Sequence, residues 1–181
     1  MSDKIRQLAE KYHAGQFRKG PEHLPYIVHP QGVAQTLLEW GERADSPAVA
    51  IAWGHDLLED TTVTVAEIRA AAGERVLRGI EILTRPREED KSLYLRKVAE
   101  SGDREALLVK AADRICNTRD FVKLEGAPYA LEYLHEAAAV KAALAALPGD
   151  RAAMAALAAW DALDAELRGA RENRRGKGEE R

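Results

Sequence analysis

The chain has 181 residues, the length of one domain, and 46% of them are hydrophobic, which is enough for a sizeable core. A formal net charge of -3 argues against a nucleic-acid-binding surface and against attraction to a membrane. Cys116 is the one cysteine, so no intrachain disulfide can form, and the N-terminus has no apolar signal stretch. We therefore expect a soluble, cytoplasmic protein that binds neither nucleic acid nor membrane.

Apolar residues recur at helical spacing along most of the chain, and Gly, Pro and capping residues separate the runs. Ser46 before Pro47 predicts the start of one helix. Thr64 and Glu67 match a capping box, and Asp103 can cap a long helix. No strand-like alternation exceeds a few residues, so we predict an all-α fold, a single-domain helical bundle with little or no β-sheet. The predicted helices cover, in chain order, residues 4–16, 30–41, 48–58, 64–73, 76–83, 92–100, 103–120 and 128–147, followed by a last helix after the turn at 148–150.

The end of the chain has a different composition. From Arg168 onward the apolar residues disappear and charged residues dominate. Such a segment has little with which to join a core, so it is expected to stay solvated. The sequence therefore predicts one domain over residues 1–167 and a charged, flexible C-terminal tail over residues 168–181.

The stretch 48–58 is apolar nearly all round, which is typical of a central, buried helix. Four polar residues stand at its C-terminal end, at positions i, i+1, i+4 and i+5, and these positions share one side of a helix. Polar groups on a buried helix need partners or a ligand, because desolvating them unpaired is costly. The four residues are His55, Asp56, Glu59 and Asp60.

Imidazole and carboxylate groups in this number suggest a metal site. One helix cannot supply four ligands with good geometry, so His29 and Asp113 are the expected contributors from elsewhere, Asp113 because it stands in an otherwise apolar run. We predict that His29, His55, Asp56 and Asp113 hold one divalent cation and leave positions open for water and substrate. Each residue alone has an ordinary structural explanation, whereas the ordered set is improbable by chance.

Glu59 and Asp60 then lie one turn further on, close to the metal without binding it. Two neighbouring carboxylates repel each other, which raises one apparent pKa and favours a shared proton. One could activate a water molecule while the other protonates a leaving oxygen. A metal with its own acid/base pair is typical of a hydrolase.

Four signatures in one order give the chain a resemblance to a known family. They are Arg18-Lys19, PYIVHP at residues 25–30, HDLLED at residues 55–60 and KAADRICN at residues 110–117. Over roughly residues 5–150 the sequence resembles the hydrolase domain of RelA/SpoT proteins, within the HD phosphohydrolase superfamily. A chain of this length resembles a free-standing small alarmone hydrolase of the kind found in metazoa.

The resemblance implies an all-helical fold of the HD-domain type and manganese (Mn²⁺, one ion per chain) as the cofactor. It also implies a nucleotide as the partner, namely guanosine tetra- or pentaphosphate, from which the 3′-pyrophosphate is removed to leave GDP or GTP. Matched position by position, it assigns metal ligation to His29, His55, Asp56 and Asp113, catalysis to Glu59 and Asp60, packing on the purine base to Arg18 and Lys19, and contact with the ribose region to Asn117.

The chain also departs from the family pattern near the expected base site. Two extra residues lie between Arg18 and Pro25, a segment that includes His23, and Asp120 stands where relatives often have Thr. These departures leave open another nucleotide substrate, such as an adenine alarmone or NADPH. A nucleotide-binding module without activity is a further alternative. A plain helical interaction protein is disfavoured, because it gives no reason for Asp56 and Asp113 in apolar helices. The oligomeric state stays open, a homo-oligomer included.

Overall fold

The computed structural model describes residues 2–178 of the chain, and these form eleven helices without a β-strand. One isolated β-bridge joins Phe17 and Pro25 in the loop between the first two helices. The predicted all-α fold is therefore confirmed. The helices are α1 (Ser2–Tyr12), α2 (Val28–Glu39), α3 (Pro47–Gly54), α4 (Leu57–Asp60), α5 (Val65–Ala72), α6 (Glu74–Leu83), α7 (Lys91–Glu100), α8 (Arg104–Leu124), α9 (Ala127–Glu136), α10 (Ala138–Ala145) and α11 (Arg151–Gly178).

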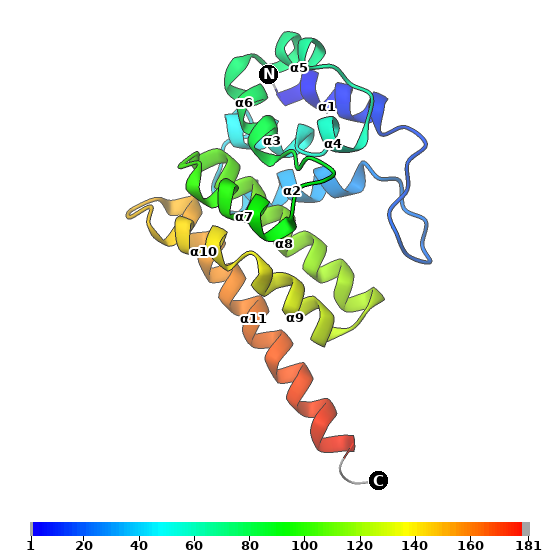
Figure 1. Cartoon of the computed structure of the whole chain (residues 1–181), viewed down its shortest axis with the longest axis vertical. Helices are drawn as coiled ribbons and strands as arrows, with labels where there is room; N and C mark the ends of the chain where they lie inside the picture. Colours follow the sequence, from blue (N-terminus) through cyan, green and yellow to red (C-terminus); the bar gives the residue numbers. More distant parts are fainter. Residues whose placement is uncertain (1, 179–181) are drawn as a thin grey trace.

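Helix α3 is the centre of the N-terminal half, and it packs against α1, α2, α6 and α8. Its side chains are mostly small and almost all of them are buried, so four neighbours can approach its backbone closely. Figure 1 shows α1 to α6 gathered at one end of the molecule. Helix α8 connects this end to the second half, where it packs against α9, α10 and α11. The site described below lies where α2, α3 and α8 meet.

The capping residues act as the sequence predicts. The Ser46 hydroxyl accepts a hydrogen bond from the Val49 N–H, with Pro47 at the first helical position. Thr64 and Glu67 form a complete capping box at the start of α5. Asp103 caps α8 by accepting from the Ala106 N–H. These local signals fix helix starts because they satisfy backbone donors that have no partner inside the helix.

The prediction of one continuous helix over residues 48–58 is wrong. Helix α3 ends at Gly54, the chain turns through His55 and Asp56, and the short α4 begins at Leu57. A side chain at Gly54 would meet Ile80 Cδ1 at 2.7 Å and Ile5 Cγ1 at 3.1 Å, so its absence allows α3 to pack closely at this turn. His55 and Asp56 consequently reach the site from a turn rather than from one regular helical face.

Other helix boundaries also differ from the predicted ones, by smaller amounts. The predicted helix over residues 128–147 is two helices, α9 and α10, separated at Ala137, which has φ -95° and ψ 26° and is fully buried. A run so rich in Ala favours a helix throughout and carries no local stop signal, so only packing decides where it bends. Helix α1 ends at Tyr12 rather than near residue 16, and α8 continues to Leu124.

The C-terminal segment continues a helix where the sequence predicts a tail. Helix α11 runs through Arg168 to Gly178, and residues 179–181 lie outside the described part of the chain. The division into a domain over 1–167 and a flexible tail over 168–181 therefore stays a prediction. In the region from residue 2 to residue 178, no helix combines the length and apolar character required to cross a bilayer.

The packing at Gly54 leads to a testable prediction. Gly54→Ala places a methyl group against Ile5 and Ile80, both fully buried, and should lower the free energy of unfolding by about 1–3 kcal/mol. Gly169→Ala in α11 is the matched control, because nothing lies within 4 Å of its added Cβ. The control should be neutral or stabilising by up to about 1 kcal/mol, since Ala favours a helix. Urea denaturation measures both, and equal effects would contradict the packing argument.

Candidate active site

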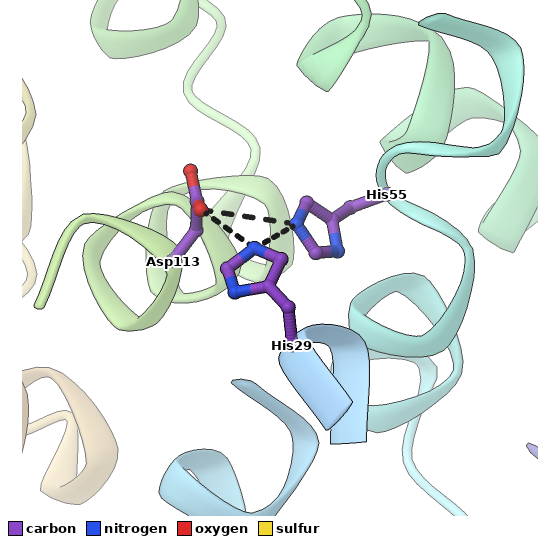
Figure 2. Close-up of side chains that lie close together, drawn as sticks. All are labelled: His29, His55 and Asp113. Carbon is purple, nitrogen blue, oxygen red and sulfur yellow. Dashed lines mark hydrogen bonds and ion pairs between the residues drawn. The ribbon is translucent and has the colours of Figure 1, made fainter. Parts of the chain in front are cut away.

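Three buried side chains from distant parts of the chain meet at one point, as Figure 2 shows. His29 comes from the first turn of α2, His55 from the turn after α3, and Asp113 from the middle of α8. His29 Nε2 lies 3.2 Å from Asp113 Oδ1 and 3.3 Å from His55 Nε2. The distance from His55 Nε2 to Asp113 Oδ1 is 3.8 Å. The three could serve as ligands of one metal ion.

Asp56, the fourth predicted ligand, borders this cluster. Its Oδ2 lies 3.1 Å from His55 Nε2 and 3.6 Å from His29 Nε2. Its side chain is 20% exposed, whereas those of His29, His55 and Asp113 are at most 6% exposed. The structure thus brings all four residues together, with Asp56 on the solvent side of the cluster.

The surroundings of His55 prepare it to bind a cation. Its Nδ1 lies 2.7 Å from the Ala52 carbonyl oxygen, which fixes the proton on Nδ1 and leaves Nε2 facing the cluster. Burial alone would lower the pKa of His55, but the carboxylates of Asp56 and Asp113 outweigh burial and raise it to about 9. Two imidazoles with two carboxylates are a donor set that suits a divalent cation.

Asp113 is held in place by two neighbours on its own helix. Lys110 Nζ donates to Asp113 Oδ2 at 2.9 Å, and Asn117 Nδ2 donates to Asp113 Oδ1 at 2.5 Å. Burial would raise the pKa of Asp113, but the Lys110 ammonium and the hydrogen bond from His29 outweigh it and hold the pKa well below its usual range. Lys110 thus orients a candidate ligand instead of reaching toward solvent. Groups that orient ligands in this way commonly tune a metal site.

Glu59 and Asp60, the predicted acid/base pair, lie on α4 and have different partners. Glu59 Oε2 accepts a hydrogen bond from the Arg85 backbone N–H at 3.0 Å. Asp60 Oδ2 accepts from the Tyr26 hydroxyl at 3.1 Å. Burial raises the pKa of both carboxyls, and the negative charge of Asp56 adds to the effect. Raised pKa values suit carboxyl groups that exchange protons near neutral pH.

A cleft of about 800 Å³ contains nearly all the predicted site residues. His55 alone among them does not line it, because it lies behind the cluster. Four further cationic side chains face the cleft: Arg85, Lys91, Lys110 and Arg114. Arg85 and Lys91 were not predicted as site residues. They stand in and next to a charged loop, and such loops are usually just solvated, so their positive charge alone did not point to the cleft.

Arg18, one of the predicted base-packing residues, is tied to α8. Its Nη2 donates to Asn117 Oδ1 and to Asp120 Oδ2, each at 2.7 Å. Its Cζ lies 5.6 Å from the centre of the Tyr26 ring. Asp120 therefore pairs directly with a predicted substrate-binding residue. The loop after Arg18 contains His23 in a left-handed conformation at φ 45°.

Comparisons with known proteins agree with this fold. A family model described as an HD domain matches residues 6–146, and the chain belongs to this family. A solved structure of a metazoan orthologue of SpoT, described as hydrolysing ppGpp, superposes with a TM-score of 0.74 at 23% sequence identity, covering 91% of this chain and 94% of that one. At this identity the likeness establishes the shared HD-type helical fold.

Two curated relatives are named guanosine-3′,5′-bis(diphosphate) 3′-pyrophosphohydrolase. The protein of Danio rerio is 38% identical over 115 residues, which is 62% of this chain and 63% of that protein. The protein of Xenopus tropicalis is 40% identical over 116 residues, which is 62% of this chain and 64% of that protein. The matched segment thus spans less than two thirds of either relative.

Removing one candidate ligand should weaken metal binding. Asp113→Asn replaces a carboxylate with a neutral amide and deprives Lys110 of its counter-charge, so Mn²⁺ affinity should fall by at least about 100-fold. Isothermal titration calorimetry measures the affinity. Asp45→Asn is the control, because Asp45 is exposed, pairs with Arg43 and does not line the cleft. An unchanged affinity in Asp113→Asn would show that the ion binds elsewhere.

Proposed function

We propose that this protein is a manganese-dependent phosphohydrolase that removes the 3′-pyrophosphate of guanosine tetra- or pentaphosphate and leaves GDP or GTP. One observation carries the proposal: a single cleft holds the imidazole–carboxylate cluster, a second pair of carboxyls with raised pKa values, and several cationic side chains. The names of the relatives support the choice of substrate. A cytoplasmic location remains a prediction from the sequence.

His29, His55, Asp56 and Asp113 would hold the cation. When bound, a divalent cation supplies Lewis-acid polarisation of a phosphoryl oxygen. The buried side of the cluster is rigid, because Lys110, Asn117 and the Ala52 carbonyl orient its members. Asp56 faces the cleft, so the substrate approaches the cluster from that side.

Glu59 and Asp60 handle the protons of the reaction. Hydrolysis breaks the bond between the ribose 3′-oxygen and phosphorus and forms a new bond from phosphorus to the oxygen of water. One carboxylate accepts the proton that the attacking water loses, and the other, as a carboxylic acid, donates a proton to the departing 3′-oxygen. Burial raises the pKa of both carboxyls, which favours the protonated form that a general acid requires.

The cationic side chains of the cleft suit a polyphosphate. Arg18 and Lys19 line one part of it, and Arg85 and Lys91 line it as well. Guanidinium and ammonium groups bind phosphate oxygens through charge-assisted hydrogen bonds, and a planar guanidinium can also stack on a base. Arg18 and Lys19 are the proposed contacts to the purine, and Asn117 is the proposed contact near the ribose.

A second candidate is the related hydrolysis of an adenine alarmone or of NADPH. The pairing of Arg18 with Asp120 supports this second candidate, because the Asp120 carboxylate changes the charge beside the proposed base site. The loop around His23 lines a neighbouring pocket of about 380 Å³, which shares Arg18 and Lys19 with the cleft.

Product analysis tests the proposed function. Purified protein with Mn²⁺ should convert guanosine tetraphosphate to GDP and pyrophosphate, as resolved by anion-exchange chromatography, and EDTA should abolish the reaction. Faster release of phosphate from NADPH, or faster turnover of the adenine alarmone, would favour the second candidate. Binding of the alarmone without turnover would instead identify a non-catalytic nucleotide-binding module.

Substitution of the acid/base pair gives an independent prediction. Glu59→Gln and Asp60→Asn should each lower kcat by about 10²–10⁴-fold, because an amide cannot exchange the required proton. Both variants should keep their Mn²⁺ content, as measured by atomic absorption. Glu10→Gln and Asp45→Asn are controls with the same chemistry on exposed residues, and their kcat should not change. A loss of metal in Glu59→Gln or Asp60→Asn would make that residue a ligand instead.

A further inference from the structure

The Tyr26 side chain contacts both kinds of carboxylate in the cleft. Its hydroxyl lies 2.8 Å from Asp56 Oδ2 and 3.1 Å from Asp60 Oδ2. Asp56 is the predicted fourth ligand that borders the metal cluster, and Asp60 belongs to the proposed acid/base pair. A single phenolic oxygen therefore contacts both a predicted metal ligand and a proposed acid/base residue.

The Tyr26 ring is itself fixed from several sides. It stacks on His13 with the ring centres 4.7 Å apart and an angle of 26° between the planes. The Tyr26 backbone N–H donates to the Gln16 carbonyl oxygen at 2.9 Å. Arg18 lies over the ring as well. A ring held in this way cannot swing its hydroxyl away from the two carboxylates without breaking several contacts.

A second contact from the same loop holds the backbone of Asp60. Gln16 Nε2 donates to the Asp60 carbonyl oxygen at 2.9 Å. The Gln16 side chain is in turn oriented by His13, whose Nδ1 lies 2.7 Å from Gln16 Oε1. His13, which is 3% exposed, thus supports both Tyr26 and Gln16 from behind. The loop between α1 and α2 consequently holds Asp60 at its side chain and at its backbone.

The charges explain why such a support is needed. Asp56 and Asp60 are both acidic and share one polar cleft, so they repel each other when both are ionised. The phenol has a single O–H, so at any moment it donates to one of the two carboxylates, and this bond orients the carboxylate that accepts it. Groups that orient metal ligands commonly change metal affinity or activity by 10- to 100-fold when removed.

We propose that Tyr26 is a positioning residue that holds Asp56 and Asp60 in fixed orientations relative to each other, with Gln16 securing the backbone of Asp60. The kinetic part of this inference rests on the proposed function. Its metal-binding part does not, because Tyr26 contacts Asp56, a predicted metal ligand, directly.

The test is Tyr26→Phe, which keeps the stacked ring and removes only the hydroxyl. Mn²⁺ affinity, measured by titration calorimetry, should fall by about 10-fold, because Asp56 loses its orienting bond. At saturating Mn²⁺ the kcat for release of pyrophosphate should fall by about 10- to 100-fold, with KM within about 2-fold of the wild-type value. An affinity and a kcat both within 2-fold of wild type would overturn the proposal, as would a raised KM with an unchanged kcat.

Tyr12→Phe is the matched control. The Tyr12 hydroxyl also donates to a carboxylate, that of Glu67, but it does so at the contact between α1 and α5, outside the cleft. This variant should keep the Mn²⁺ affinity and the kcat of the wild-type protein. If Tyr12→Phe lost as much Mn²⁺ affinity and kcat as Tyr26→Phe, the effect of Tyr26→Phe would reflect general stability and not positioning.

Gln16→Met tests the contact to the Asp60 backbone separately from the Tyr26 hydroxyl. It also provides a second test if Tyr26→Phe does not fold. It removes the bond to the Asp60 carbonyl oxygen and leaves Asp56 untouched, so kcat should fall while Mn²⁺ affinity stays within 2-fold of wild type. An equal fall in Mn²⁺ affinity, or an unchanged kcat, would contradict the assignment. If the wild-type protein releases no pyrophosphate, the proposed function fails, and the calorimetric comparison of Tyr26→Phe with Tyr12→Phe still decides the role of Tyr26.

Discussion

The close approach of two imidazoles and a carboxylate at the junction of α2, α3 and α8 is the contact on which the rest of the site depends. Removing charged and polar groups from water costs several kcal/mol for each ion, so such a cluster persists only where every member has a partner. Here Lys110 and Asn117 hold Asp113, and the Ala52 carbonyl holds His55. The small residues of α3 allow the helices to bring these groups within 4 Å of one another.

The cleft separates the proposed tasks in space. The metal cluster lies at its buried side, the acid/base pair stands on α4, and the loop between α1 and α2 supplies both Arg18 and Tyr26. This loop therefore lines the cleft and contacts the carboxylates at once. Arg18 pairs with Asp120, so its guanidinium compensates a carboxylate that also lines the cleft.

Much of the fold was predictable from local signals. Ser46, Thr64 and Asp103 mark helix starts because a side-chain oxygen satisfies a free backbone N–H, an effect confined to a few residues. The two errors of continuity, at residues 48–58 and 128–147, fall in runs of apolar or Ala residues that favour a helix throughout. The turn follows Gly54, which packs against Ile5 and Ile80 of other helices, and the break lies at the fully buried Ala137, so both stand where tertiary packing is tight.

The sequence by itself determined the helical class, the family and the set of donors that could bind a cation, because residue type and spacing carry that information. Only the tertiary structure decided how the donors are supported. Tyr26 between Asp56 and Asp60, and the backbone of Arg85 at Glu59, are contacts across about 26 to 34 positions of the chain. Such contacts depend on how the helices pack, and packing is a property of the whole core rather than of any one segment.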